Sequence, residues 1–179
     1  EKFYVGEDIH TMEKPWEFDD FIFDGDVLKG MTRKGKDKIK ENGYFDMVVP
    51  TEGPDGTKIR VIGEQCFFRR KLNSVVIPET VEEIKYEAFG VNNLTEVIIP
   101  DAVKKIDSYA FYRNKLTDVK MPKEVEYIGD NAFSLNQYLN SRFSFLIFFS
   151  SFPRARGFFS LSSIVTHCSS FFSLLFYCF

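Results

Sequence analysis

The sequence VEEIKYEAFGVNNLTEVIIPDA at residues 81–102 is followed directly by VKKIDSYAFYRNKLTDVKMPKE at 103–124 and by VEYIGDNAFSLNQ at 125–137. The three segments align without gaps, and residues 62–80 fit the same register. In one unit the apolar columns are Ile84, Ala88, Phe89, Leu94, Val97, Ile99, Pro100 and Val103. A unit of this length cannot bury its own apolar face, so successive units must stack as coils of a solenoid.

Each unit contains a β-branched run that ends in proline, as at 97–100. Val97 and Ile99 are two residues apart and therefore share one face of a strand, which the proline ends because it has no N–H to donate. Within 81–89 the apolar residues are spaced by three and four, which favours a helical or 3₁₀ turn. The small residue before Phe89 lets that turn approach the strands. We expect the phenylalanines of successive coils to stack as a ladder through the core.

The unit reads I-G-x-x-A-F-x-x-N-x-L-T-x-V-x-I-P-x-x-V-x-x, with 128–133 and 94–100 as its clearest segments. Over residues 62–137 it resembles the BspA-type leucine-rich repeat. The resemblance implies an α/β leucine-rich-repeat solenoid with short parallel strands on the concave face and short helical turns on the convex face. Many family members have Cys shortly after the Phe. Here that column holds Arg70, Asn92, Asn114 and Asn136, and the asparagines are expected to bond backbone groups at the turn.

The same resemblance implies a cell-surface or extracellular protein that functions in adhesion to a host. It also implies a protein or glycan ligand, and host extracellular matrix is one possible source of that ligand. Solenoids use the outward side of their strands for ligands. Because Val75 and Ile77 face the core, the candidate ligand-binding residues are Ser74, Val76, Glu96, Ile98, Asp118 and Lys120. Two alternatives stay open: a structural spacer within a larger surface protein, and an intracellular scaffold tethered to a membrane.

Residues 1–15 are predicted to be a linker, and residues 16–61 an N-terminal cap that covers the first apolar edge of the solenoid. Asp24-Gly25 indicates the turn of a hairpin. Thr32 is expected to cap a short helix that runs through Ile39 and stops at Gly43. The run 47–50, which also ends in proline, matches the strand of the repeat.

Residues 138–179 contain 11 Phe and 10 Ser in 42 positions and no Lys, Asp or Glu. Three interpretations compete: a translated non-coding or antisense read, a membrane anchor at 157–179, and a folded cap. The first interpretation is favoured, and it predicts a tail that is disordered or not native. The encoding DNA would decide between the three interpretations. Membrane contact depends on the second, in which Arg154 and Arg156 would keep the repeats in the cytoplasm. Without a C-terminal cap, residues 16–137 alone are expected to be marginally stable or to self-associate.

Residues 1–137 hold 20 Lys/Arg against 26 Asp/Glu, a balance that argues against nucleic acid as a partner. The acids Asp19, Asp20, Asp24 and Asp26 lack EF-hand spacing, so a solvated hairpin is the favoured interpretation. The basic run at 33–40 is interpreted as an exposed helix face. Neither His10 nor His167 has a partner motif, and Cys66 occupies a column of small buried residues. We therefore predict no catalytic residues, no metal and no cofactor.

Overall fold

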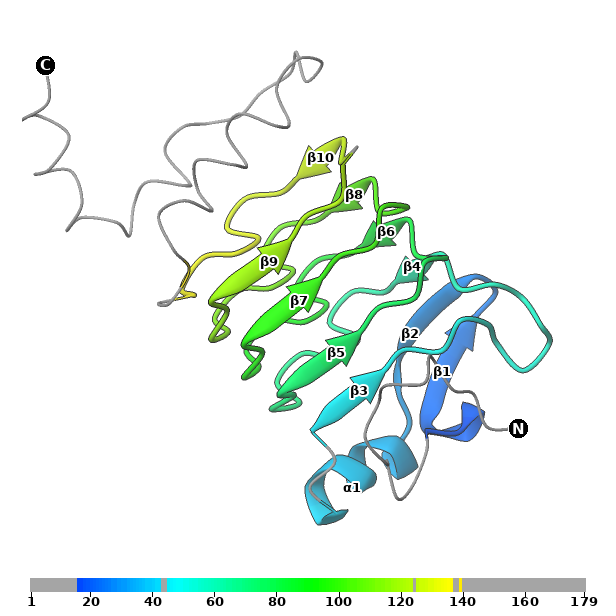
Figure 1. Ribbon diagram of the computed structural model, residues 1–179. Helices are drawn as coiled ribbons and strands as arrows, with labels where there is room; N and C mark the ends of the chain where they lie inside the picture. The colour runs from blue at the N-terminus through cyan, green and yellow to red at the C-terminus, as the bar shows by residue number, and fades with distance from the viewer. Residues whose placement is uncertain (1–15, 43–44, 124, 137–138, 140–179) are drawn as a thin grey trace, which may run out of the picture.

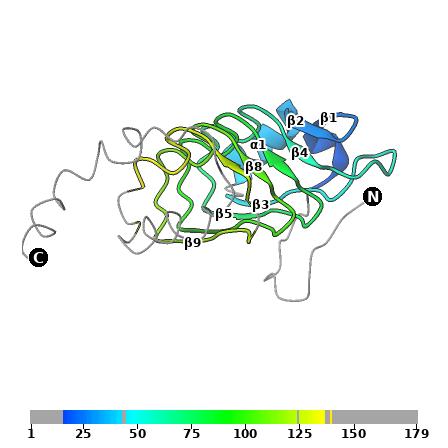
Figure 2. The same cartoon turned by 90° about the horizontal axis from the view of Figure 1, so that it is seen from above.

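The computed structural model describes residues 16–42, 45–123, 125–136 and 139. In this part of the chain the repeats form coils stacked one on the next, with the N-terminal segment at one end of the stack (Figures 1 and 2). The predicted linker at 1–15 lies outside the described residues, and so does the tail at 138–179 except for Leu139. The domain boundaries given above therefore stay predictions.

Two rows of strands run along the stack, one behind the other in Figure 1. The rear row is a six-stranded sheet of β1 (Phe21–Asp24), β2 (Val27–Met31), β4 (Val61–Ile62), β6 (Glu83–Ile84), β8 (Lys105–Ile106) and β10 (Tyr127–Ile128). The front row contains two paired sets, β3 (Asp46–Val48) with β5 (Ser74–Val76), and β7 (Glu96–Ile98) with β9 (Asp118–Lys120). Only β1 and β2 pair antiparallel; the other named pairs are parallel.

The strand register follows the sequence repeat. Ile62, Ile84 and Ile106 are successive partners in the rear sheet. In the front row Val97 is the partner of Val119. Parallel partners one repeat apart give neighbouring strands the same side chains on the same face, which is why a column in the sequence becomes a row in the structure.

The helical turns expected at 81–89 and its equivalents do not form; a two-residue strand and two successive turns stand there instead. Ala88 N donates to Lys85 O at 3.1 Å, and Gly90 N donates to Glu87 O at 3.0 Å. The N–H between them, that of Phe89, donates to Ala110 O of the next coil at 2.8 Å. Alternate N–H groups are thus committed to the neighbouring coil, which leaves no run of donors for a helix.

The phenylalanine ladder is confirmed. The rings of Phe67 and Phe89 are stacked with centroids 5.3 Å apart, those of Phe89 and Phe111 are 5.2 Å apart, and those of Phe111 and Phe133 are 5.3 Å apart. Phe67, Phe89 and Phe111 are completely buried. The three fully buried rings form the centre of a continuous apolar core. This stacking is what the 22-residue period predicts.

Residues 16–61 form the elements expected of the segment before the repeat. β1 and β2 make the predicted hairpin, with Gly25 at φ +58° in its turn. α1 (Arg33–Asn42) begins after Thr32, whose hydroxyl oxygen accepts from Gly35 N at 3.3 Å. β2 extends the rear sheet through β4, and β3 extends the front row through β5. The first repeat strands are therefore paired on both sides of the solenoid.

Candidate binding site

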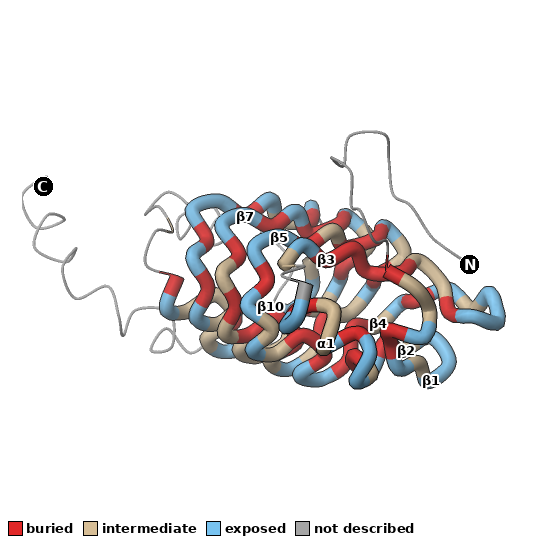
Figure 3. Tube along the Cα trace, turned by 90° about the horizontal axis from the view of Figure 1, so that it is seen from below, coloured by how far each residue is buried: buried red, intermediate tan, exposed pale blue. Residues whose placement is uncertain are grey.

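The six candidate residues all lie on β5, β7 and β9, on the strand side that faces away from the core. We call this surface, defined by Ser74, Val76, Glu96, Ile98, Asp118 and Lys120, the strand face. Buried and exposed residues alternate along these strands (Figure 3). Val76 is half-buried, and the other five are exposed. Their placement matches the sequence expectation, and ligand binding by them stays a prediction.

The apolar part of the strand face centres on one residue. Ile98 is 60% exposed, whereas Val76, the corresponding residue one coil earlier, is half-buried. Val48, the register partner of Val76 in β3, is buried. The exposure of the side chains in this row therefore increases along the stack from Val48 to Ile98. The next residue in the row, Lys120, is also exposed but charged, so the apolar part of the row ends at Ile98. Of the two apolar residues on the strand face, Ile98 is therefore exposed, and Val76 is more sheltered.

A row of acidic and hydroxyl side chains runs beside Ile98. Asp46 and Ser74 are register partners, and the Ser74 hydroxyl donates to Asp46 Oδ1 at 2.6 Å. Glu96 and Asp118 are also partners, so two carboxylates lie on neighbouring strands. None of the salt bridges among the described residues involves Glu96 or Asp118. Like charges at the strand spacing repel each other, at a cost of about 0.8 kcal/mol in water.

The outward side of the rear sheet is built differently, because its charges are paired from coil to coil. Arg60 Nη1 lies 2.9 Å from Glu82 Oε1, and Lys105 Nζ lies 2.7 Å from Glu83 Oε1. The Glu83 carboxylate raises the pKa of Lys105. Lys105 Nζ also lies 5.8 Å from the centre of the Tyr127 ring. This side satisfies its own charges, so the strand face is the better candidate for contact with a partner.

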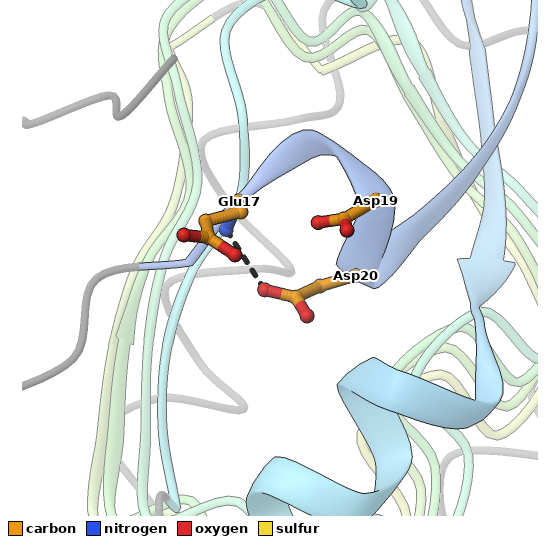
Figure 4. A group of neighbouring side chains, drawn as sticks. All are labelled: Glu17, Asp19 and Asp20. Atoms are coloured by element: carbon orange, nitrogen blue, oxygen red, sulfur yellow. Dashed lines mark hydrogen bonds between the residues drawn. The ribbon is translucent and has the colours of Figure 1, made fainter.

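Three acidic residues gather in the N-terminal segment, at η1 (Phe18–Asp20). Glu17, Asp19 and Asp20 each have a carboxylate oxygen within 4.8 Å of the others (Figure 4). Lys34 Nζ lies 2.7 Å from both Glu17 Oε2 and Asp19 Oδ2, and it lowers the pKa of both carboxyls. Lys38 is paired with Asp20 Oδ2. Two ammonium groups thus occupy the place of a cation.

The sequence-based interpretation of these acids as a solvated hairpin is correct for Asp24, which is exposed at the end of β1 and pairs with Lys29. It is wrong for Asp20, which is fully buried and accepts from Glu17 N at 2.8 Å. The interpretation of 33–40 as an exposed helix face is likewise incomplete, because Lys34 and Lys38 face this cluster. Lysines one helical turn apart, beside a segment rich in acids, are a signal that could have indicated the pairing.

The asparagine column behaves as expected. Asn92 accepts through Oδ1 from Arg70 N at 3.0 Å and from Leu72 N at 3.1 Å. Its Nδ2 donates to the oxygens of Phe67 and Phe89, each at 2.9 Å. Asn114 and Asn136 donate to the equivalent pairs of backbone oxygens, accept from Leu94 N and Leu116 N respectively, and are also buried. The column is structural, since its hydrogen-bonding capacity is used within the coils.

Cys66 is the small buried residue that its column predicts. It is 2% exposed, and burial raises the pKa of its thiol. A thiol that is buried and protonated is a poor nucleophile. It therefore belongs to the core of the first repeat.

The chain belongs to the BspA type leucine rich repeat region family, described as having 6 copies, which it matches over residues 56–151. That range is just over half of the 179 residues and includes the columns described above. The match extends past residue 137, the predicted end of the repeats. No protein with a curated description matches the chain.

Two solved structures are similar to this chain. The first is a leucine-rich repeat protein from Bacteroides ovatus ATCC 8483, 24% identical, with a TM-score of 0.38 over 52% of this chain and 30% of that one. The second is a leucine rich cell surface protein from Faecalibacterium prausnitzii A2-165, 22% identical, with a TM-score of 0.31 over 53% of this chain and 18% of that one. The matched part is thus less than a third of the length of each of these two solved structures.

Among the described residues no helix has both the length and the apolar character needed to cross a membrane. The membrane anchor considered at 157–179 lies outside the described residues.

Proposed function

We propose that this chain is a non-catalytic cell-surface module that binds a protein or glycan through the strand face. Membership of the BspA-type family supports the surface location and the adhesive role. The observation that carries the proposal is the combination of Ile98, 60% exposed, with the neighbouring carboxylates of Glu96 and Asp118, which form no salt bridge within the described part of the chain. An apolar contact beside a charged rim is the usual composition of a binding surface.

The arrangement also indicates what a partner must offer. An apolar group would cover Ile98, and a cationic or hydrogen-bond-donating group would relieve the repulsion between Glu96 and Asp118. Extracellular-matrix proteins expose both kinds of side chain, so they are the first ligands to test. The strands present these groups on a rigid frame, which limits the conformational entropy lost on binding.

The test uses the whole chain against a panel of immobilised extracellular-matrix proteins and a glycan array. The affinity of the variant Ile98→Lys for any ligand found in this way is then compared with the affinity of the unmodified chain. The proposal predicts a loss of affinity of at least about tenfold, which is 1.4 kcal/mol. Ile22→Lys is the matched control, because Ile22 is also a strand isoleucine, 46% exposed, but lies on β1.

Equal binding by Ile98→Lys and the unmodified chain would contradict the strand-face proposal. Absence of any ligand on both panels would contradict the binding function itself and favour the structural-spacer alternative. Retention of the far-ultraviolet circular dichroism spectrum and of Tm shows that a loss of binding does not come from unfolding.

A further inference from the structure

We propose that the solenoid has a second binding site, for an acidic oligosaccharide that carries sulfate or carboxylate groups. The site lies along the edge from which β5, β7 and β9 start, and we call it the basic edge. It is defined by Arg69, Lys71, Arg113 and Lys115. This site is separate from the strand face and does not depend on the function proposed above.

Positive charge is distributed unevenly on the solenoid, and it is concentrated at the basic edge. The loop residues at 68–73, 90–95, 112–117 and 134–136 include five Lys or Arg and no Asp or Glu. The chain up to residue 137 has the opposite balance, with acids in excess. Among the described residues, no salt bridge involves a cation of the basic edge. Within the described part of the chain, the four cations of the basic edge thus have no ion-pair partner.

A cavity opens between these loops. Its volume is about 420 Å³, within the size range of small-ligand sites. Its lining combines the cations Lys71, Arg113 and Lys115 with the amide of Asn93 and the apolar side chains of Val91 and Leu135. Cations, an amide and apolar side chains are the groups that would contact the anionic groups, hydroxyls and C–H surfaces of a sugar.

The fold fixes the backbone positions from which the cations of the basic edge extend. Arg69, Lys71 and Arg113 have φ of +55°, +61° and +53°, in the left-handed region that non-glycine residues seldom adopt. The stacking of the coils maintains these conformations. Lys71 and Lys115 occupy one column two coils apart, which places their backbones about 10 Å apart. A short acidic oligosaccharide, which repeats its charge at regular intervals, complements such an array.

The residues favour a sugar over the other common polyanion, nucleic acid. The cavity lining contains no aromatic side chain, so bases would have no stacking surface there. The acidic surroundings oppose a long, uniformly charged duplex. Asn93 has an amide that is only weakly engaged, since Nδ2 lies 3.4 Å from Lys71 O, and it can turn toward a hydroxyl.

Titration calorimetry with the whole chain and a sulfated heparin oligosaccharide tests the proposal. The expected result is binding at about 50 mM NaCl that weakens as salt rises. The triple substitution Lys71→Gln, Arg113→Gln and Lys115→Gln is expected to weaken binding at least about tenfold. A desulfated oligosaccharide that keeps its carboxylates distinguishes the two anions: equal affinity assigns the site to carboxylate, and weaker binding assigns it to sulfate.

The matched control is the triple substitution Lys36→Gln, Lys40→Gln and Lys104→Gln. It removes the same charge from exposed lysines outside the basic edge, and we expect it to change affinity less than about threefold. Equal weakening by both triple variants would overturn the proposal, because net charge alone would then explain binding. So would a lack of binding to the sulfated oligosaccharide, or equal affinity for single-stranded DNA or poly-glutamate.

Two further measurements keep the test independent of folding and of the strand face. Lys115→Glu alone, in a chain whose Tm is unchanged, should also weaken the interaction; full binding by this variant would contradict the proposal. Ile98→Lys should leave oligosaccharide binding intact, so that the failure of one proposed site is distinguishable from the failure of the other.

Discussion

The side-chain amide of Asn92 donates a hydrogen bond of 2.9 Å to the backbone oxygen of Phe67, in the preceding coil. Through Oδ1 the same side chain accepts from two further backbone N–H groups of that coil. One asparagine per repeat therefore ties two coils together where the chain turns toward the strands. The front row of strands therefore depends on an interior polar ladder as well as on the apolar core.

Asn92→Ala should lower the free energy of unfolding by about 2–4 kcal/mol, because it leaves several buried backbone groups without partners. The measurement is urea unfolding followed by circular dichroism. Asn93→Ala is the control. Asn93 is half-buried, and its hydrogen bond to Lys71 O is long, at 3.4 Å, so a loss below about 1 kcal/mol is expected. Equal losses would show that the buried ladder has no special part in stability.

Phe89→Ala should cost about 3–5 kcal/mol, since it opens a cavity between two stacked rings in the core. Phe68→Ala removes a phenylalanine that is only half-buried, and we expect a clearly smaller loss. Chemical denaturation of both variants measures the difference. A Phe89 variant as stable as the Phe68 variant would be incompatible with an interior ladder.

Asp118→Asn should raise stability by about 0.5 kcal/mol at low salt, because it removes the repulsion from Glu96. The gain should disappear in about 1 M NaCl, where screening suppresses the repulsion. Comparing unfolding curves at both salt concentrations measures the effect. A stabilising effect of the same size at high salt would point to a cause other than charge.

Acid should destabilise the N-terminal segment through Glu17 and Asp19. The Lys34 ammonium lowers the pKa of both carboxyls below their ordinary values of 4.5 and 3.8. A lowered folded-state pKa contributes stability that is present above the unfolded-state pKa and lost as pH falls through the folded-state pKa. Tm should therefore fall below about pH 4.5 in the unmodified chain and fall less in Lys34→Met. Parallel pH profiles would contradict this assignment.

The apolar columns were sufficient to predict the coil, the phenylalanine ladder and the outward direction of Ile98, because a parallel stack converts a period of 22 into rows. They were not sufficient at 81–89. A spacing of three and four between Val81, Ile84 and Ala88 suits a helix and equally suits consecutive turns. The choice is made by N–H groups that bond to the next coil, and these leave no trace in apolar periodicity.

The polar contacts were harder to predict. The pairing of Asp20 with Lys38 joins a 3₁₀ turn to a helix, and no column relates these residues. The basic edge was hard to predict for a different reason. Its cations recur only in alternate repeats, because Val91 stands between Arg69 and Arg113 in one column and Asn93 stands between Lys71 and Lys115 in the other. The columns therefore indicate which residues share an edge, but they do not indicate the cavity between its loops.

Oxidative cross-linking tests the stacked register most directly. In a chain with Cys168→Ser and Cys178→Ser, the pair Glu96→Cys and Asp118→Cys places two thiols on directly opposed strand positions, within the Cα separation of a disulfide. The pair Glu96→Cys and Lys120→Cys is two residues out of register, at about 8 Å, beyond that range. We predict rapid disulfide formation in the first pair and little in the second. Cross-linking that is equal in both pairs, or faster in the second, would contradict the stacked coils on which both proposed sites depend.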